Sequence, residues 1–265
     1  MAYQTLLVED KGPVRIITLN QPAAFNPLDH ISGTELIHAM NSAGNEPEVR
    51  AVVLTGAGKA FAAGGNLRLM RKVLEEGGDI SAWFREIGGL LKDSVLAIAS
   101  LHKPVVCAMN GVAAGGGIGW ALACDLIVAS TKARFEPGYI KIAVCPDGGT
   151  SVLVSRLIGL KRAARFFMLA EPIDASTAKD WGMINEVVEP QELMPTAMAW
   201  AQELAKGPAM ALTETKKLLA MAALKDLADL MDEELKRICT LAARAEFAEG
   251  IKAFFERREP NFTQF

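Results

Sequence analysis

Three consecutive glycines, Gly115 to Gly117, stand between an apolar run and a second apolar stretch that carries no charge before Asp125. A glycine pair at 64–65 follows another apolar run in the same way. Such a junction suits a phosphate cradle, a close packing contact, or backbone N–H groups aimed at a developing negative charge. Repeated strand-to-helix junctions of this kind indicate an α/β fold.

The apolar pattern predicts strands that alternate with helices along most of the chain. We expect a hairpin at 5–20, a helix from about Ile31, a strand at 49–58, a helix at 81–101 and a strand at 104–111. A helix that begins at the glycine triplet and two further strands, at 125–130 and 184–188, complete the pattern. From Pro190 to residue 256 the period is helical, with breaks expected at Gly207-Pro208 and Gly250. We therefore expect an α/β core at 1–189 and a helical C-terminal region at 190–265.

The bulk properties exclude several kinds of partner. The 265 residues are 51% hydrophobic and can bury a large core, and the net charge of −3 is spread without a basic stripe. No apolar run has the length of a membrane span, and the N-terminus lacks the pattern of a signal peptide. The four cysteines form no CxxC and are expected to be reduced. These features predict a cytoplasmic protein that binds neither nucleic acid nor membrane.

The glycine spacing argues against nucleotide-binding loops. Neither GxGxxG nor GxxxxGK[ST] fits "GVAAGGGIGW" or "TGAGKAFAAGGNL". What remains at 61–67 and 113–119 is a pair of junctions that offer free N–H groups at a helix start. Two such donors around one oxygen would form an oxyanion hole. For either segment alone, tight packing of a helix on a strand is the favoured alternative.

Other reactive side chains give weaker signals. His30, His38 and His102 lack metal-ligand spacing, so no metal site is expected. Ser151 and Ser155 fall on a predicted helix without the GxSxG elbow of a serine nucleophile.

Five segments, in order and spacing, are similar to those of the crotonase superfamily, the enoyl-CoA hydratases and isomerases. They are "LNQPAAFNPLD", "AVVLTGAGKAFAAGGNL", "KPVVCAMNGVAAGGGIGWALACDLIVAS", "PDGGTSVLVSRLIG" and "EGIKAFFERREPNF". The resemblance covers about residues 5–262. It implies a spiral of ββα repeats, a C-terminal trimerisation region, and a homotrimer or a dimer of trimers. It also implies an acyl-CoA thioester as substrate, no permanently bound cofactor, and an oxyanion hole at the N–H groups of Gly65 and Gly116.

The acid/base residues depart from the hydratase pattern. Hydratases of this family carry glutamates at the positions of Gly119 and Tyr139, and both carboxylates are absent here. Glu136 lies off the family position and is expected to be solvated or structural. Asp147 matches the single acidic residue of the enoyl-CoA isomerases. The resemblance therefore implies a 1,3-proton transfer by Asp147 while the oxyanion hole holds an enolate.

Asp147 leaves alternatives open. It precedes a Gly-Gly turn at a predicted helix start, so capping of that helix is the other role for its side chain. As a base it needs a raised pKa, which Val144, Cys145 and Trp120 would supply if they line the pocket. Hydratase or thioester hydrolase chemistry, with Asp147 activating water, is the alternative reaction. A non-catalytic or RNA-binding relative is the alternative class.

The resemblance also implies where coenzyme A lies. Backbone atoms at four matching positions would bind its nucleotide: Ala24, Asn26, Leu28 and Ala63. Phe254 and Arg257 would reach the coenzyme A of a neighbouring subunit, and a plain surface charge is the alternative for Arg257.

Two expectations concern the surroundings of the site. Asn66 replaces an aspartate of many relatives, and its side chain is expected to fix the loop. The acyl group is expected to lie against 68–87 and the region around Tyr139.

Overall fold

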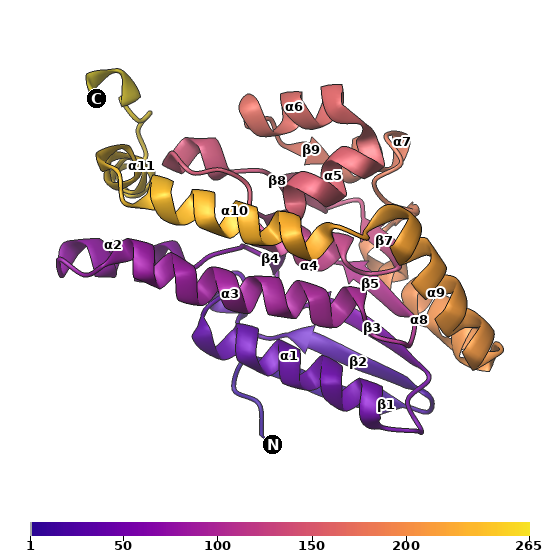
Figure 1. Ribbon diagram of the computed structural model, residues 1–265. Helices are drawn as coiled ribbons and strands as arrows, with labels where there is room; N and C mark the ends of the chain where they lie inside the picture. The colour runs from indigo at the N-terminus through magenta and orange to yellow at the C-terminus, as the bar shows by residue number, and fades with distance from the viewer. Residues whose placement is uncertain (1) are drawn as a thin grey trace.

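Two β-sheets share the strands of the chain (Figure 1). The computed structural model describes residues 2–265, so Met1 of the predicted 1–189 core lies outside the described residues. The larger sheet has the order β1 (Leu6–Lys11), β2 (Val14–Leu19), β3 (Ala51–Gly56), β5 (Val105–Met109), β7 (Leu126–Ser130) and β10 (Glu186–Val188). The smaller sheet has the order β4 (Ala60–Ala62), β6 (Val112–Ala114), β8 (Arg134–Glu136) and β9 (Ile173–Asp174).

After the hairpin β1–β2, three successive turns of the chain each give one strand to each sheet and then continue into helix. After β3 and β4 come α2 (Leu67–Glu75) and α3 (Ile80–Ala99), and after β5 and β6 comes α4 (Gly116–Leu122). After β7 and β8 come the short η2 (Tyr139–Ile142) and α5 (Thr150–Ile158). Strands β2, β3, β5, β7 and β10 pair in parallel, as do β4, β6 and β8, so each return needs a crossover. The predicted ββα spiral is confirmed.

Local sequence explains where the early helices begin. Asp29 accepts hydrogen bonds from the N–H groups of Ile31 and Ser32 and starts α1 (His30–Asn45) with a capping box. Asn66 caps α2 by accepting from the N–H of Leu69 at 3.3 Å, as expected for a side chain that fixes this loop. Helix α1 and the hairpin β1–β2 also lie where the sequence predicts them.

The C-terminal helices pack on the same chain. Helix α8 (Leu193–Lys206) covers one face of the larger sheet with Leu193 and three alanines. Helix α10 (Leu227–Ala242) runs along α3, and α11 (Ala245–Glu256) lies against η2 and α2 (Figure 1). Met231 of α10 and Phe247 of α11 belong to the central hydrophobic core. The division at 189/190 stays a prediction, while the core itself draws on both sides of it.

One helix stands apart from this packing. Helix α9 (Ala209–Ala223) buries none of its residues, and Met210, Leu218, Leu219 and Met221 are exposed. The remaining helical segments are η1 (Pro22–Ala24), α6 (Leu160–Met168), α7 (Ala175–Asp180), η3 (Pro190–Glu192) and η4 (Phe262–Gln264). Across residues 2–265, no helix combines the length and apolar character that a bilayer crossing requires.

The expected break at Gly250 is wrong. Helix α11 continues through Gly250, where a Cβ atom would lie 2.6 Å from the Cα of Ile142 in η2. The glycine therefore allows close packing of a helix rather than ending one. Gly207-Pro208, by contrast, separates α8 from α9 as predicted.

Two glycines of the triplet have different roles, one in the backbone conformation and one in the packing of α4. Gly115 has φ +48°, a region that residues with a side chain rarely adopt. At Gly117 a Cβ atom would lie 2.4 Å from the carbonyl oxygen of Ala62, so only glycine lets α4 approach β4 this closely. Close packing is thus one part of the answer to why the triplet exists.

The packing role of Gly117 predicts the effect of a single methyl group. We expect Gly117→Ala to lower the free energy of unfolding by about 1–3 kcal/mol, because overpacking displaces backbone that has no room to move. Gly89→Ala in α3 is the matched control, since a Cβ atom there meets nothing within 4 Å. Urea unfolding of both variants measures the difference, and equal stability of the two would contradict the packing role.

Candidate active site

Two backbone N–H groups lack an acceptor where the glycine junctions meet. Gly65 lies between β4 and α2, and Gly116 is the first residue of α4. Within residues 2–265, neither N–H donates a hydrogen bond to a protein acceptor. A Cβ atom on Gly64 would lie 3.2 Å from the nitrogen of Gly116, so the two junctions are in contact. This is the arrangement that an oxyanion hole needs, and the shared oxygen between the two donors stays a prediction.

The loop before α1 is clamped onto this junction. The Leu28 N–H donates to the carbonyl of Gly64 at 2.6 Å, and the Ala63 N–H donates to that of Phe25 at 2.9 Å. The buried Asn26 amide donates to three carbonyls at the β3–β4 turn and in β4, those of Ala57, Ala60 and Phe61, at 3.0, 2.9 and 3.1 Å. The structure thus brings three predicted coenzyme A positions, Asn26, Leu28 and Ala63, together beside Gly65, and the fourth, Ala24, lies in the short helix η1 of the same loop. The Asn26 side chain is an internal brace.

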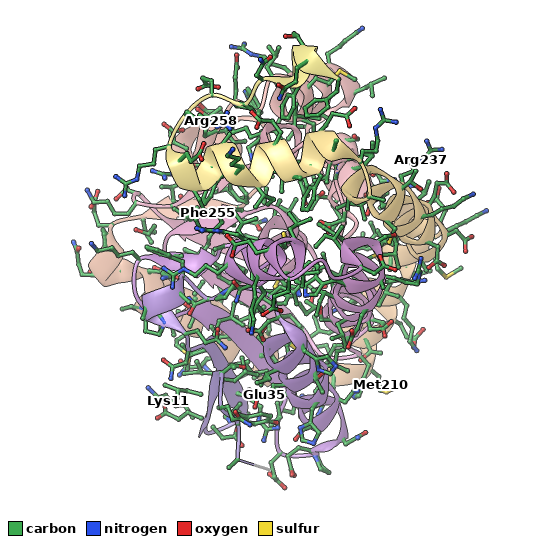
Figure 2. All side chains as sticks on the ribbon, turned by 90° about the vertical axis from the view of Figure 1, so that its left-hand side faces the viewer. Lys11, Glu35, Met210, Arg237, Phe255 and Arg258 are labelled. Carbon is green, nitrogen blue, oxygen red and sulfur yellow. The ribbon has the colours of Figure 1, made fainter. Side chains whose placement is uncertain are left out.

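The other two predicted coenzyme A residues lie on α11. Phe254 is 55% exposed, whereas the neighbouring Phe255 turns toward the body of the protein, where the guanidinium of Arg71 lies 4.9 Å from its ring centre (Figure 2). Arg258 pairs with Glu249 and Glu256, while Arg257 forms no ion pair within residues 2–265. Phe254 and Arg257 therefore both remain available to another molecule at this end of α11.

Asp147 lies on the turn between η2 and α5, and its carboxylate is free of the capping role. The N-cap of α5 is Gly149, and no side chain of the cap residue bonds to the helix. Instead the Tyr139 hydroxyl donates to Asp147 Oδ1 at 3.1 Å and lies 3.2 Å from Thr150 Oγ1. Thr150 Oγ1 donates to the Asp147 carbonyl at 2.8 Å and fixes the turn. The alternative role of Asp147 as the cap of α5 is therefore not seen, and its acid/base role stays a prediction.

The surroundings of Asp147 make it a group that can exchange a proton near neutral pH. Burial, and next the negative charge of Glu234, raise the pKa of Asp147 to about 7, against the lowering effect of the Tyr139 hydrogen bond. Burial, and next the negative charge of the nearby Asp147, raise the pKa of the Cys145 thiol to about 11. Trp120, which would help to raise the pKa of Asp147 if it lined the pocket, is fully buried and donates its indole N–H to Ser94.

The Asp147 turn packs directly against the glycine junction. Leu91 of α3 joins them, because Cβ atoms placed on Gly116 and Gly148 would lie 2.6 and 2.7 Å from its Cδ2. At Gly119, one turn into α4, a Cβ atom would lie 2.3 Å from the carbonyl oxygen of Gly148. The space in which a hydratase glutamate at Gly119 would start is thus filled by the backbone that carries Asp147.

Tyr139 stands at the other position that carries a glutamate in hydratases. Its ring lies 3.9 Å from where a Cβ on Gly115 would be, and it is buried. From the sequence, only the missing carboxylate was evident there. The signal that was available is the residue type, since a buried tyrosine hydroxyl needs a polar partner and Asp147 lies eight residues away.

Glu234 is the functional neighbour that sequence reasoning missed. From α10 it accepts hydrogen bonds from the N–H groups of Gly149 and Ser151, at 2.7 and 3.0 Å, and from the Ser151 hydroxyl. It is 7% exposed, and burial raises its pKa. Glu234 thus supplies the helix cap that the Gly-Gly turn cannot.

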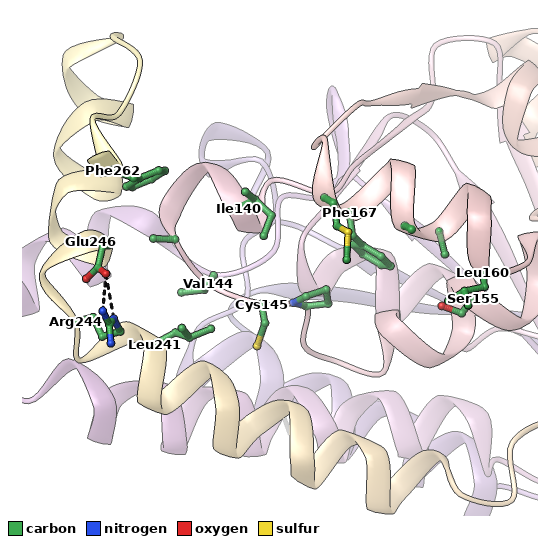
Figure 3. Close-up of a pocket in the computed structure, with 15 residues that line it drawn as sticks. Ile140, Val144, Cys145, Ser155, Leu160, Phe167, Leu241, Arg244, Glu246 and Phe262 are labelled. Atoms are coloured by element: carbon green, nitrogen blue, oxygen red, sulfur yellow. Dashed lines mark hydrogen bonds and ion pairs between the residues drawn. The ribbon is translucent and has the colours of Figure 1, made fainter. Parts of the chain in front are cut away.

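A large apolar hollow lies beside the segment that leads to Asp147 (Figure 3). Its volume is about 590 Å³, and its walls come from 140–146, α5 and α6, the 241–246 turn and Phe262. The region around Tyr139 therefore contributes to a hollow through Ile140, but none of its lining comes from the expected stretch 68–87. Gly65, Gly116 and Asp147 are not part of its wall, so we assign the candidate active site to the glycine junction instead.

The remaining candidates have structural roles. His30 pairs with Glu86, and His38 hydrogen-bonds the Tyr3 hydroxyl. Within residues 2–265 no group of histidine, cysteine, aspartate and glutamate side chains forms a metal site. Glu136 pairs with Arg134, as expected for a structural glutamate.

Comparison with known proteins identifies the family. The family model described as enoyl-CoA hydratase/isomerase matches residues 9–265. The chain belongs to the enoyl-CoA hydratase/isomerase family. It is an enzyme of this family with the crotonase fold, as the resemblance implied.

Three relatives illustrate the range of names within the family. The 1,2-epoxyphenylacetyl-CoA isomerase of Escherichia coli is 32% identical over 254 residues, which cover 96% of each chain. The short-chain-enoyl-CoA hydratase of Clostridium acetobutylicum is 31% identical over 260 residues, with 98% of this chain and 97% of the relative covered. A crystal structure of an enoyl-CoA hydratase from Mycobacterium avium subsp. paratuberculosis superposes with a TM-score of 0.88 at 33% identity, covering 98% and 99% of the chains.

The contact at Gly119 predicts a strong effect on turnover of enoyl-CoA esters. We expect Gly119→Ala to lower kcat about 10²-fold, because the added methyl group displaces the Gly148 carbonyl and with it Asp147. Steady-state kinetics with circular dichroism as a check of folding measure this. Gly89→Ala again serves as the control, and a Gly119→Ala enzyme with the kcat of the unaltered protein would show that the contact does not position Asp147.

Proposed function

We propose that this enzyme shifts the double bond of an enoyl-CoA ester by a 1,3-proton transfer, with Asp147 as the acid/base group. Asp147 removes a proton from the γ-carbon, the electrons move onto the thioester oxygen as a dienolate, and the proton returns to the α-carbon. The N–H groups of Gly65 and Gly116 stabilise the dienolate oxygen, each contributing about 2.7–4 kcal/mol in the transition state. The reaction needs no other reactant, so the mass of the ester is unchanged.

The observation that carries this proposal is that the turn of Asp147, a partly buried carboxylate, packs against the glycine junction while neither hydratase glutamate position carries a carboxylate. Hydration needs one group to activate water and another to protonate the α-carbon. Gly119 has no room for the first hydratase glutamate, and Tyr139 occupies the second position with a hydroxyl. A 1,3-shift needs only one group that first accepts and then returns a proton, and Asp147 has the pKa for both steps.

Hydration is the alternative reaction, and the names of the relatives favour it. More of the relatives compared are called hydratases than isomerases. In that case, or in thioester hydrolysis, Asp147 would activate water. The products separate the three reactions, because hydration adds the mass of water and hydrolysis releases the coenzyme A thiol. An RNA-binding relative without turnover would instead retard RNA in a gel in a salt-dependent way.

The proposal includes coenzyme A and the assembly. Coenzyme A enters as part of the thioester, along the clamped backbone from Ala24 to Leu28 and at Ala63. The available side chains of Phe254 and Arg257 support a contact with the coenzyme A of a neighbouring subunit in a homotrimer or a dimer of trimers. The exposed apolar residues of α6 and α9 support such an assembly, Leu160, Met168, Leu218 and Leu219 among them.

Removal of the Asp147 carboxylate tests the reaction. We expect Asp147→Asn to lower kcat for isomerisation 10²- to 10⁴-fold, the usual contribution of a positioned acid/base group. A panel of 2-enoyl- and 3-enoyl-CoA esters, read by mass spectrometry, identifies both product and rate. Glu136→Gln is the matched control because this nearby carboxylate pairs with Arg134. Full activity of Asp147→Asn on the best ester would show that another group moves the proton.

The pH dependence follows from the raised pKa of Asp147. The base must be ionised to accept a proton, so kcat/KM should rise with pH and level off above a midpoint at about 7. An aspartate with its ordinary pKa would give a midpoint near ~4. Initial rates from pH 5 to 9 locate the midpoint, and a profile flat across this range would exclude Asp147 as the titrating base.

A further inference from the structure

We infer that Glu234 is a positioning residue that holds the Asp147 turn and keeps a negative charge beside it, so that Asp147 is the member of this carboxylate pair that carries the exchangeable proton. The link to catalysis rests on the proposed function. The assignment of the negative charge to Glu234 and of the proton to Asp147 does not rest on the proposed function.

The hydrogen bonds of Glu234 fix the turn from outside. The first N–H groups of a helix have no partner within the helix, and Gly149 offers no side chain to cap α5. Glu234 accepts from the N–H groups of Gly149 and Ser151, which directly follow Asp147-Gly148. The position of Asp147 relative to α4 therefore depends on a side chain from α10.

The two carboxylates have unequal hydrogen-bond partners. Glu234 receives two backbone N–H groups and the Ser151 hydroxyl, and all three donors stabilise its ionised form. Asp147 receives the Tyr139 hydroxyl and its own backbone N–H. Glu234 binds the N–H groups two and four residues after Asp147, and its charge raises the pKa of Asp147, so the two carboxylates do not both ionise easily and the proton resides on the one with fewer donors. That residue is Asp147.

The other charged groups on the helices around the pair form ion pairs with one another. On α10, Arg237 pairs with Glu233, and Asp232 pairs with Lys92 of α3. On α5, Arg156 pairs with Asp226 at the start of α10. Tyr139 and the Cys145 thiol both have raised pKa values and stay neutral near pH 7. Among residues 2–265, neither Asp147 nor Glu234 takes part in an ion pair.

Carbon-13 NMR of the side-chain carboxyl groups tests the assignment without any substrate. In the full-length wild-type protein we expect Asp147 to titrate at a higher pH than Glu234, with Asp147→Asn and Glu234→Gln identifying the two signals. In Glu234→Gln, the midpoint of Asp147 should fall by roughly one pH unit, because the neighbouring charge is gone. Asp232→Asn, on the same helix, is the matched control and should leave that midpoint in place.

The outcomes separate this inference from the proposed function. If Glu234 titrates at the higher pH in the wild type, or if Glu234→Gln leaves the Asp147 midpoint unchanged, the inference is overturned. Should Glu234→Gln fail to fold, the order of titration in the wild type decides alone. If the wild type isomerises no ester, the proposed function fails while the titration still assigns the proton. Where turnover exists, the pH midpoint of kcat/KM in Glu234→Gln should shift together with the NMR midpoint, which a purely structural cap would not produce.

Discussion

The contact between α4 and the turn that carries Asp147 determines what chemistry this site can hold. A Cβ atom at Gly119 would lie 2.3 Å from the Gly148 carbonyl, so one helix and one turn meet backbone to backbone. The same closeness excludes a carboxylate from Gly119 and brings Asp147 toward the free N–H groups of Gly65 and Gly116. A glycine position therefore selects between the two-carboxylate pattern of hydratases and a single acid/base group.

The C-terminal helices belong to this site as much as the spiral does. Helix α10 runs along α3, which supplies Leu91 to the junction, and sends Glu234 to the N-terminus of α5. Burial is the main cause of the raised pKa of Asp147, and the negative charge of Glu234 from α10 is the next. The helical region at 190–265 thus shapes the electrostatics of the site, in addition to its proposed part in subunit contacts.

Local sequence patterns predicted much of the fold, but they did not predict contacts between residues that are far apart in the sequence. Strands β3, β5 and β7 are continuous apolar runs, and helices α1 and α3 repeat apolar residues at helical spacing. The strands of the smaller sheet are two or three residues long and too short to show a pattern. The resemblance supplied Asp147, Gly65 and Gly116, whose roles remain predictions. Glu234 was missed because its partner Gly149 lies 85 residues away, and a glutamate on a helix looks like any solvated charge.

The most direct test of the central claim follows a single hydrogen atom. A 2-enoyl-CoA ester labelled with deuterium at the γ-carbon is incubated with the enzyme in ordinary water, and the product is analysed by mass spectrometry and NMR. Because one buried carboxyl group both accepts and returns the proton, part of the 3-enoyl-CoA product should carry deuterium at the α-carbon. A 3-hydroxyacyl-CoA product, or an isomerised ester whose new α-hydrogen comes entirely from the solvent, would contradict the account.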